Sequence, residues 1–95
     1  KINLNEILYV QSLENYVIIQ SETSKEIAYS PLKKIMEYLP EPQFIQVHRS
    51  FVINSLKVEA IEGNQLVIQN YKIPIARNLR EATFESLLKN KLISR

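Results

Sequence analysis

The apolar residues of this chain fall in short runs, and turn-forming residues interrupt these runs every few positions. The β-branched and aromatic residues that favour strands gather in eight segments: residues 7–11, 16–21, 26–29, 44–47, 51–53, 57–61, 65–69 and 72–75. The first two, ILYVQ and YVIIQS, are joined by SLEN and are typical of a hairpin. Short strands at such close intervals predict a mainly β fold with a meandering antiparallel sheet.

Two helices are expected beside the strands. Ser30 is a preferred N-cap and Pro31 suits the first helical position, so a helix should begin there and end at Pro40. Its apolar stripe indicates core packing rather than a cofactor site, and consists of Leu32, Ile35, Met36 and Leu39. A closing helix from about residue 78 to about residue 90 is indicated by Leu79, Ala82, Leu87 and Leu88.

The composition excludes several classes of protein. A chain of 95 residues is long enough for one core, so residues 1–95 are expected to form a single domain. Without cysteine there are no disulfides or thiolate metal sites, and one histidine cannot build the usual zinc shell. The single glycine argues against a phosphate-cradling loop. No metal or cofactor is therefore expected.

The same sequence gives expectations about location and context. No apolar segment reaches the roughly 18 residues that cross a bilayer, and the amino terminus lacks the pattern of a secretory signal. A cytoplasmic location and no membrane partner are therefore expected. Because Lys1 is not an initiating methionine, the chain is expected to be a domain of a longer protein.

The net charge of +2 is unevenly distributed along the chain. Residues 1–48 hold four Lys or Arg against six Glu, a net charge of −2. Residues 49–95 hold eight against four, a net charge of +4, and this excess begins at Arg49. Electrostatic attraction depends on local patches, so the asymmetry points only weakly to an anionic partner. On charge alone, an ordinary solvated face is the better explanation.

One segment, FIQVHRSFVINS at residues 44–55, interrupts an apolar run with a histidine, an arginine and a serine. His48 and Ser50 are two positions apart, and the chain has no aspartate that could orient an imidazole for nucleophilic catalysis. A lone histidine at a strand end more often bonds to the backbone and shapes the turn that follows. No enzymatic activity is therefore expected.

This interruption belongs to a longer pattern. Three stretches, ILYVQSLENYVIIQ, SPLKKIMEYLPEPQFIQVHRSFVINSLKVEAIEG and YKIPIARNLREATFESL, resemble in order and spacing the LytTR-type DNA-binding domains of bacterial transcriptional regulators. The middle stretch is the most specific. The resemblance implies a mainly β domain with elongated antiparallel sheets and one or two small helices. It also implies that loops, rather than a recognition helix, read the DNA.

The resemblance places base-contacting side chains at Asn15 in the hairpin turn, at Arg49, and at Arg77 after IPIA. Their chemistry agrees, since asparagine pairs with adenine and arginine with guanine at the major-groove edge. Neighbouring donors should hold the phosphates and fix the register. The candidates for that role are Ser50, Asn78 and Arg80, then Lys57 and Lys72, while His48 shapes the break that displays Arg49.

Each of these assignments has an alternative. Arg49 and Arg77 could be solvated, or could pair with a glutamate such as Glu59 or Glu81, as surface arginines commonly do. Asn15 is also a natural turn residue. The chain departs from the family pattern at Ala76, where many members carry a small hydroxyl residue, so one phosphate contact is missing.

The resemblance further implies a partner and a setting. The expected protein is the carboxy-terminal output domain of a two-component response regulator, with a receiver domain in the same full-length chain. Two copies would bind tandem direct repeats in double-stranded promoter DNA and bend it. Two rival functions remain. A protein-interaction module would use an exposed sheet edge, and an RNA-binding domain would stack bases on Tyr16, Tyr29 or Tyr71, which are expected to be half-buried.

Overall fold

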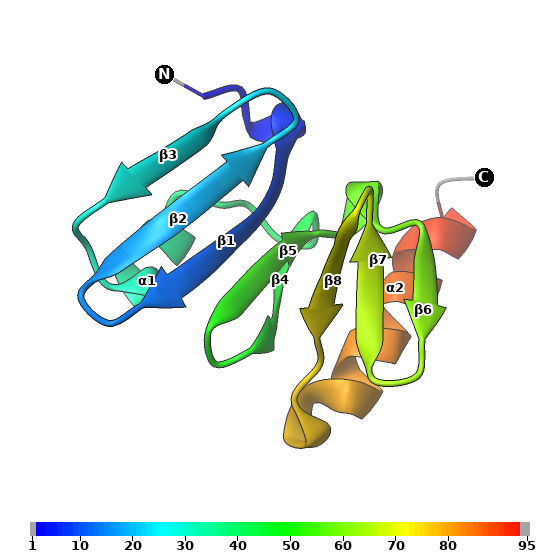
Figure 1. The fold of residues 1–95 in the computed structure, drawn as a ribbon. Helices are drawn as coiled ribbons and strands as arrows, with labels where there is room; N and C mark the ends of the chain where they lie inside the picture. The colour runs from blue at the N-terminus through cyan, green and yellow to red at the C-terminus, as the bar shows by residue number, and fades with distance from the viewer. Residues whose placement is uncertain (1, 94–95) are drawn as a thin grey trace.

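The computed structural model describes residues 2–93, with side chains as far as residue 89, and confirms the mainly β fold class (Figure 1). The strands are β1 (Ile7–Leu13), β2 (Tyr16–Ser21), β3 (Lys25–Ala28), β4 (Phe44–His48), β5 (Phe51–Asn54), β6 (Ala60–Glu62), β7 (Gln65–Ile68) and β8 (Tyr71–Pro74). The helices are α1 (Leu32–Met36) and α2 (Arg80–Ile93), with short 3-10 segments η1 (Leu4–Glu6), η2 (Ser55–Lys57) and η3 (Arg77–Leu79).

The strands form two antiparallel sheets, as the family resemblance implies, and not the one meandering sheet that the strand spacing alone suggests. The larger sheet has the order β3-β2-β1-β5-β4, and the smaller has the order β6-β7-β8. The central pairing of the larger sheet joins β1 to β5, with Tyr9 opposite Ile53. Segments distant in sequence are brought together there because both strands have apolar side chains to bury on two faces. Turn signals between neighbouring strands carry no information about such a pairing.

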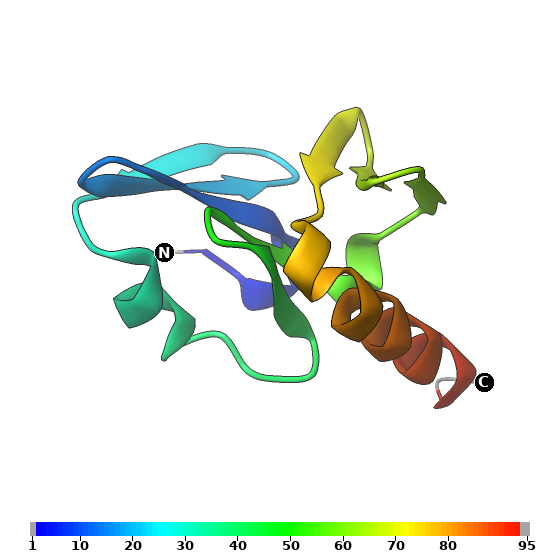
Figure 2. The ribbon, with the colours of Figure 1, turned by 90° about the horizontal axis from the view of Figure 1, so that it is seen from below.

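The core consists of two clusters on opposite sides of the larger sheet. One lies under α1 and contains Ile7, Val10, Val17, Leu32, Leu39, Phe44 and Val52. The other lies between the two sheets and α2 and contains Leu8, Tyr9, Val47, Ile53, Val58, Leu66, Ile68, Ile73, Ile75 and Leu87. Strand β1 supplies both clusters, and at its register shift between Ile7 and Tyr9 the alternation breaks, so that the consecutive residues Leu8 and Tyr9 join the same cluster. Figure 2 shows α1 against one face of the larger sheet and α2 beside its far end.

Helix α1 packs through the expected stripe, but it begins differently. Pro31, not Ser30, occupies the N-cap position, and no side chain caps the helix. The Ser30 hydroxyl donates instead to the Pro31 carbonyl oxygen at 3.2 Å, so the predicted serine cap is wrong. Pro31 has an extended backbone with ψ of 149°, and the regular helix ends at Met36, before the predicted Pro40.

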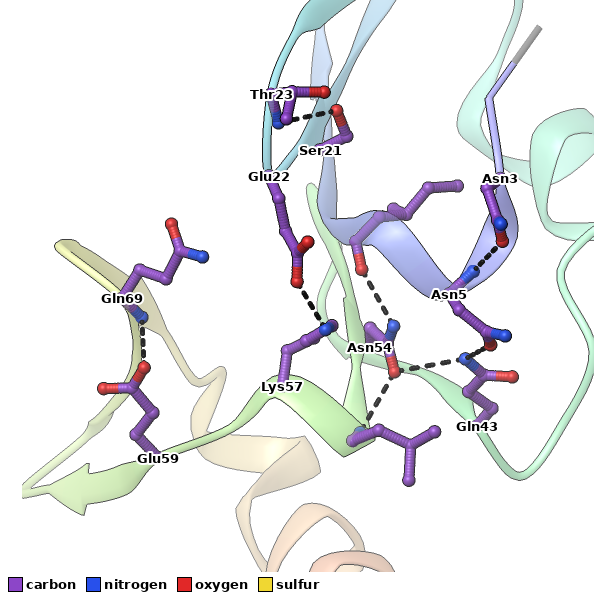
Figure 3. A network of polar contacts seen from close by, with 12 residues as sticks. Asn3, Asn5, Ser21, Glu22, Thr23, Gln43, Asn54, Lys57, Glu59 and Gln69 are labelled. Carbon is purple, nitrogen blue, oxygen red and sulfur yellow. Dashed lines mark hydrogen bonds and ion pairs between the residues drawn. The ribbon is translucent and has the colours of Figure 1, made fainter.

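The predicted strand at residues 57–61 is also wrong in its first half. Residues 55–57 form the 3-10 turn η2, because the buried Asn54 accepts a hydrogen bond from the Leu56 backbone N–H at 3.0 Å. The same side chain donates to the carbonyl oxygen of Ile7 at 2.8 Å, in the network of Figure 3. The contacts of Asn54 thereby fix the end of β5 in the larger sheet and the turn that leads to β6. A polar side chain inside an apolar run thus ends one sheet and directs the chain to the next.

Helix α2 forms where expected and runs to Ile93, beyond the predicted end. Its buried positions agree with the predicted ones only at Leu87. Thr83 and Leu87 are buried and Phe84 is half-buried, whereas Ala82 is exposed and Leu88 is 64% exposed. The helix therefore turns the row of Thr83 and Leu87 toward the core, and leaves an apolar side chain in water.

The tyrosines are not all half-buried, as had been expected. Tyr16 and Tyr71 are, and Tyr71 packs edge-on against Tyr9 with ring centroids 5.2 Å apart. Tyr29 is 82% exposed because β3 ends at Ala28. Its ring lies edge-on to that of Tyr16, with ring centroids 5.8 Å apart.

Candidate nucleic-acid interface

Main-chain hydrogen bonds join the loops at one end of the two sheets, along the lower side of Figure 1. Two consecutive residues, Ile75 and Ala76, donate their backbone N–H groups to two different loops. That of Ile75 donates to the carbonyl oxygen of Asn64 at 2.8 Å, in the β6–β7 turn. That of Ala76 donates to the carbonyl oxygen of Val47 at 2.9 Å, near the end of β4. The segment that follows β8 is therefore held between loops of both sheets.

The β4–β5 turn displays Arg49 at its tip. The imidazole Nδ1 of His48 accepts a hydrogen bond of 3.0 Å from the backbone N–H of Ser50. The imidazole ring packs edge-on against the ring of Phe51, with ring centroids 5.6 Å apart. The Gln46 side-chain amide donates to the Arg49 carbonyl oxygen at 3.5 Å. These contacts use the backbone of the turn and leave the exposed guanidinium of Arg49 free to point outward.

The β1–β2 turn is tied to the same loop. The Ser12 N–H donates to the carbonyl oxygen of Ser50 at 2.8 Å. The turn itself is formed by Glu14 and Asn15, and Glu14 has a positive φ of 51°, which non-glycine residues adopt uncommonly. Asn15 follows it at an exposed position. The hairpin turn thus lies beside the loop of Arg49.

Arg77 begins the η3 turn, immediately after Ala76, and it is exposed together with Asn78. Within the residues whose side chains are described, the ion pairs are Lys57 with Glu22 and Lys72 with Glu62. Neither Arg49 nor Arg77 is among them. The alternative partner Glu59 instead accepts a hydrogen bond from the Gln69 N–H at 3.2 Å (Figure 3). The structure therefore places Arg49 and Arg77, each exposed and without an ion pair among the described residues, on loops joined by a backbone hydrogen bond.

Arg80, at the start of α2, is held by two neighbours. One of its terminal nitrogens donates to the side-chain oxygen of Asn64. Its guanidinium carbon also lies 5.2 Å from the centroid of the Phe84 ring, within the range of a cation–π contact. Sequence reasoning missed Asn64. Only its place beside Gly63 in a turn could have drawn attention to it.

Lys57 and Lys72 are placed differently from the arginines. Lys57 lies in η2, beyond the end of β5, whereas Arg49 precedes the start of that strand, so the two are at opposite ends of β5. The ammonium group of Lys57 pairs with Glu22 (Figure 3). Lys72 pairs with Glu62 at 3.4 Å, on the smaller sheet. Both ammonium groups therefore already have a carboxylate partner.

No group of His, Cys, Asp or Glu side chains in the described part of the chain is arranged to hold a metal ion. Among residues 2–93, no helix is long and apolar enough to span a membrane.

Comparison with known proteins decides the family. The model of the LytTr DNA-binding domain matches residues 1–88. The chain belongs to this family. The resemblance inferred from the three sequence stretches is thereby confirmed, and the family is one of DNA-binding domains.

Curated relatives of this LytTr domain are longer proteins. This chain is 31% identical over 88 residues to an uncharacterized response regulatory protein of Vibrio cholerae. The match covers 83% of this chain and 34% of the relative. This chain is 24% identical over 82 residues to the sensory transduction protein LytT of Bacillus anthracis, in a match that covers 80% of this chain and 33% of that protein. The chain thus spans about a third of the length of the curated relatives it matches.

A solved structure shares the fold of this LytTr domain. A LytTr DNA-binding domain from Bacillus cereus superposes with a TM-score of 0.79, covering 92% of this chain and 84% of the other. The two are 22% identical in sequence, so the match is one of architecture.

Proposed function

We propose that this LytTr domain binds double-stranded DNA sequence-specifically. The loops that carry Asn15, Arg49 and Arg77, at the joined end of the two sheets, would enter the major groove. The observation that carries this proposal is the pair of exposed, unpaired guanidinium groups of Arg49 and Arg77 on loops tied by the Ala76–Val47 hydrogen bond. Two cationic groups held on neighbouring loops are suited to a polyanion. The stiff sheets behind them reduce the ordering cost of binding.

We assign the base contacts to Asn15, Arg49 and Arg77. An arginine can donate to both O6 and N7 of guanine, and an asparagine can pair with N6 and N7 of adenine. Each stands at a loop tip or at the start of a turn, where its side chain projects away from the sheet. The His48–Ser50 hydrogen bond fixes the backbone on either side of Arg49 and so limits the freedom that this side chain loses on binding.

Phosphate contacts are assigned to Ser50, Asn78 and Arg80, which flank the base-reading positions. Lys57 and Lys72 suit this role less well because each already pairs with a glutamate. The longest dimension of the domain is 34 Å, close to the roughly 34 to 36 Å of one turn of B-DNA. One copy would therefore cover about one turn, and two copies would occupy tandem direct repeats, with some bending of the duplex.

The setting we propose is the carboxy-terminal output domain of a two-component response regulator that controls transcription, with a receiver domain earlier in the full-length chain. It is supported by the names and lengths of the relatives, a response regulatory protein and a sensory transduction protein about three times longer than the match. Phosphorylation of the receiver would then govern how two output domains meet on promoter DNA.

Selection of bound duplexes from a random pool at physiological salt tests the proposal, with wild-type protein and the double variant Arg49→Ala/Arg77→Ala run in parallel. The wild type should enrich a short motif with guanine at fixed positions. The double variant should retain weak binding without enriching it. Failure of the wild type to enrich any motif would contradict sequence-specific readout.

The two rival functions are separated by simple controls. An RNA-binding domain would prefer single-stranded RNA over duplex DNA in direct competition, and would depend on the exposed Tyr29. A protein-interaction module would bind its partner through a sheet edge such as β3, with little dependence on salt or on either arginine.

A further inference from the structure

The β6–β7 turn forms a fourth loop at the joined end, and Asn64 is fixed there at both its backbone and its side chain. Gly63 supplies the positive φ of 60° that the turn requires. The Asn64 carbonyl oxygen accepts the Ile75 N–H at 2.8 Å, and its side-chain oxygen accepts from Arg80. This turn is thus anchored to the segment that leads directly into Arg77.

The contact with Arg80 determines which way the Asn64 amide faces. A guanidinium has only donors, so the oxygen of the amide must face Arg80 and its NH₂ group must face away. Arg80 is held in turn over the Phe84 ring, and in the described part of the chain no carboxylate pairs with it. The pair therefore offers hydrogen-bond donors and positive charge to the solvent. A ligand that only accepts hydrogen bonds and carries negative charge fits this arrangement.

We propose that Asn64 and Arg80 form a phosphate-binding site, and that its ligand is one backbone phosphate of the bound duplex. The two side chains line an open polar depression together with Ile75 and Arg77. Continuity with Arg77 favours a DNA phosphate over a free one, because the same loop segment would then contact a base and the adjacent backbone. The inference rests on the proposed DNA-binding function, and adds a fourth loop to it.

Asn64→Ala tests the site, with Asn70→Ala as a matched control. Asn70 is an exposed asparagine in the turn at the other end of β7. Asn64→Ala keeps the backbone bond to Ile75 and removes only the amide. Affinity is expected to fall roughly tenfold on a selected and on an unrelated duplex alike, the size expected for a hydrogen bond to a charged group. Arg80→Ala should weaken both duplexes and reduce the salt slope by about one. Asn70→Ala should bind as wild type.

A second variant and two further measurements test whether a loss of binding comes from the proposed site or from a change in folding. Asn64→Asp keeps the oxygen that Arg80 contacts, so it should fold as well as wild type, yet it should bind DNA more weakly than Asn64→Ala because a carboxylate repels phosphate. In the double variant Asn64→Ala/Arg80→Ala, the loss should be smaller than the product of the single losses. A single neutral methylphosphonate at that position in the duplex should weaken the wild type more than Asn64→Ala, because Asn64→Ala has already lost one of its two contacts with this phosphate.

Binding of Asn64→Asp at wild-type strength, or a double loss equal to the product of the single losses, would overturn the site. So would inorganic phosphate that binds Asn64 and Arg80 while no methylphosphonate position distinguishes Asn64→Ala from wild type, since the ligand would then be free phosphate. If Arg49→Ala and Arg77→Ala weaken binding while Asn64→Ala does not, only this inference fails. If none of the three weakens binding, the proposed function itself fails.

Discussion

The backbone N–H of Ala76 donates a hydrogen bond of 2.9 Å to the carbonyl oxygen of Val47, and so makes neighbours of the loops that carry Arg77 and Arg49. Because the bond uses only main-chain atoms, it does not depend on the side chain at position 76. Ala76 makes this link without a side-chain hydroxyl group. The relative position of the two arginines is therefore a property of the backbone.

Replacing Arg49 with alanine should lower specific affinity by about 1 to 3 kcal/mol and relax the preference at one base pair, because a bidentate contact with guanine is lost. Titration of the selected duplex and of single-base variants measures both effects. Lys33→Ala, an exposed lysine on α1, serves as the control and should bind as wild type. An equal loss on selected and unrelated duplexes would mean that Arg49 contacts only phosphate.

Replacing His48 with alanine should weaken specific binding by about 1 kcal/mol, because the Ser50 N–H loses its acceptor and the turn that holds Arg49 is less fixed. His48→Asn, whose side-chain oxygen can take the place of Nδ1, should recover part of the loss. The decisive measurement repeats both substitutions in the Arg49→Ala background. A full effect of His48→Ala there would show that His48 does not act by positioning Arg49.

Asn54→Ala should lower the free energy of unfolding by about 1 to 3 kcal/mol, since the buried Ile7 carbonyl oxygen and the partly buried Leu56 N–H would each lose a partner. Urea unfolding followed by circular dichroism gives this quantity. The exposed Asn70→Ala should change it by less than about 0.5 kcal/mol. Equal stability of both variants would show that water replaces the contacts of Asn54 at no cost.

Stability should fall in alkaline solution, and Tyr9 should contribute to the fall. Burial raises the pKa of the Tyr9 hydroxyl above its usual 10.0, and the neighbouring Tyr71 raises this pKa further. The folded protein therefore holds this proton more tightly than the unfolded chain. The contribution to stability is complete below about pH 10 and is lost as the pH rises from there through the folded pKa.

Tyr9→Phe should accordingly flatten the decline of the urea midpoint between about pH 9 and pH 11. Tyr29→Phe, at an exposed position, should leave the decline as in wild type. Identical slopes for wild type and Tyr9→Phe would contradict a buried, neutral Tyr9.

Much of the local structure could be predicted from the residues alone. The hairpin of β1 and β2, the position of α2 and the turn at Arg49 all follow from apolar runs and the turn-forming residues between them. The family also follows, because its pattern is a linear one. Of the candidate site, the exposed positions of Asn15, Arg49 and Arg77 agree with the prediction of loop residues, although their contacts with DNA stay a prediction.

Other features departed from local propensity. Ser30 does not cap α1, where Pro31 is the N-cap, and the predicted strand does not begin at residue 57, because the buried Asn54 caps the η2 turn and bonds to the distant Ile7. The buried face of α2 was set by the sheets on which it packs. Nothing next to Asn64 in the sequence signals that Arg80 would bond to it.

Sequence alone thus determined most of the strands, helices and turns, though not all of their ends, because periodicity and turn chemistry act over a few neighbouring residues. Tertiary structure alone decided that β1 pairs with β5, which strands belong to each sheet, and that four loops meet at one end. The physical reason is that burial of apolar faces and pairing of backbone groups are satisfied between distant segments, whose choice of partner depends on the whole chain.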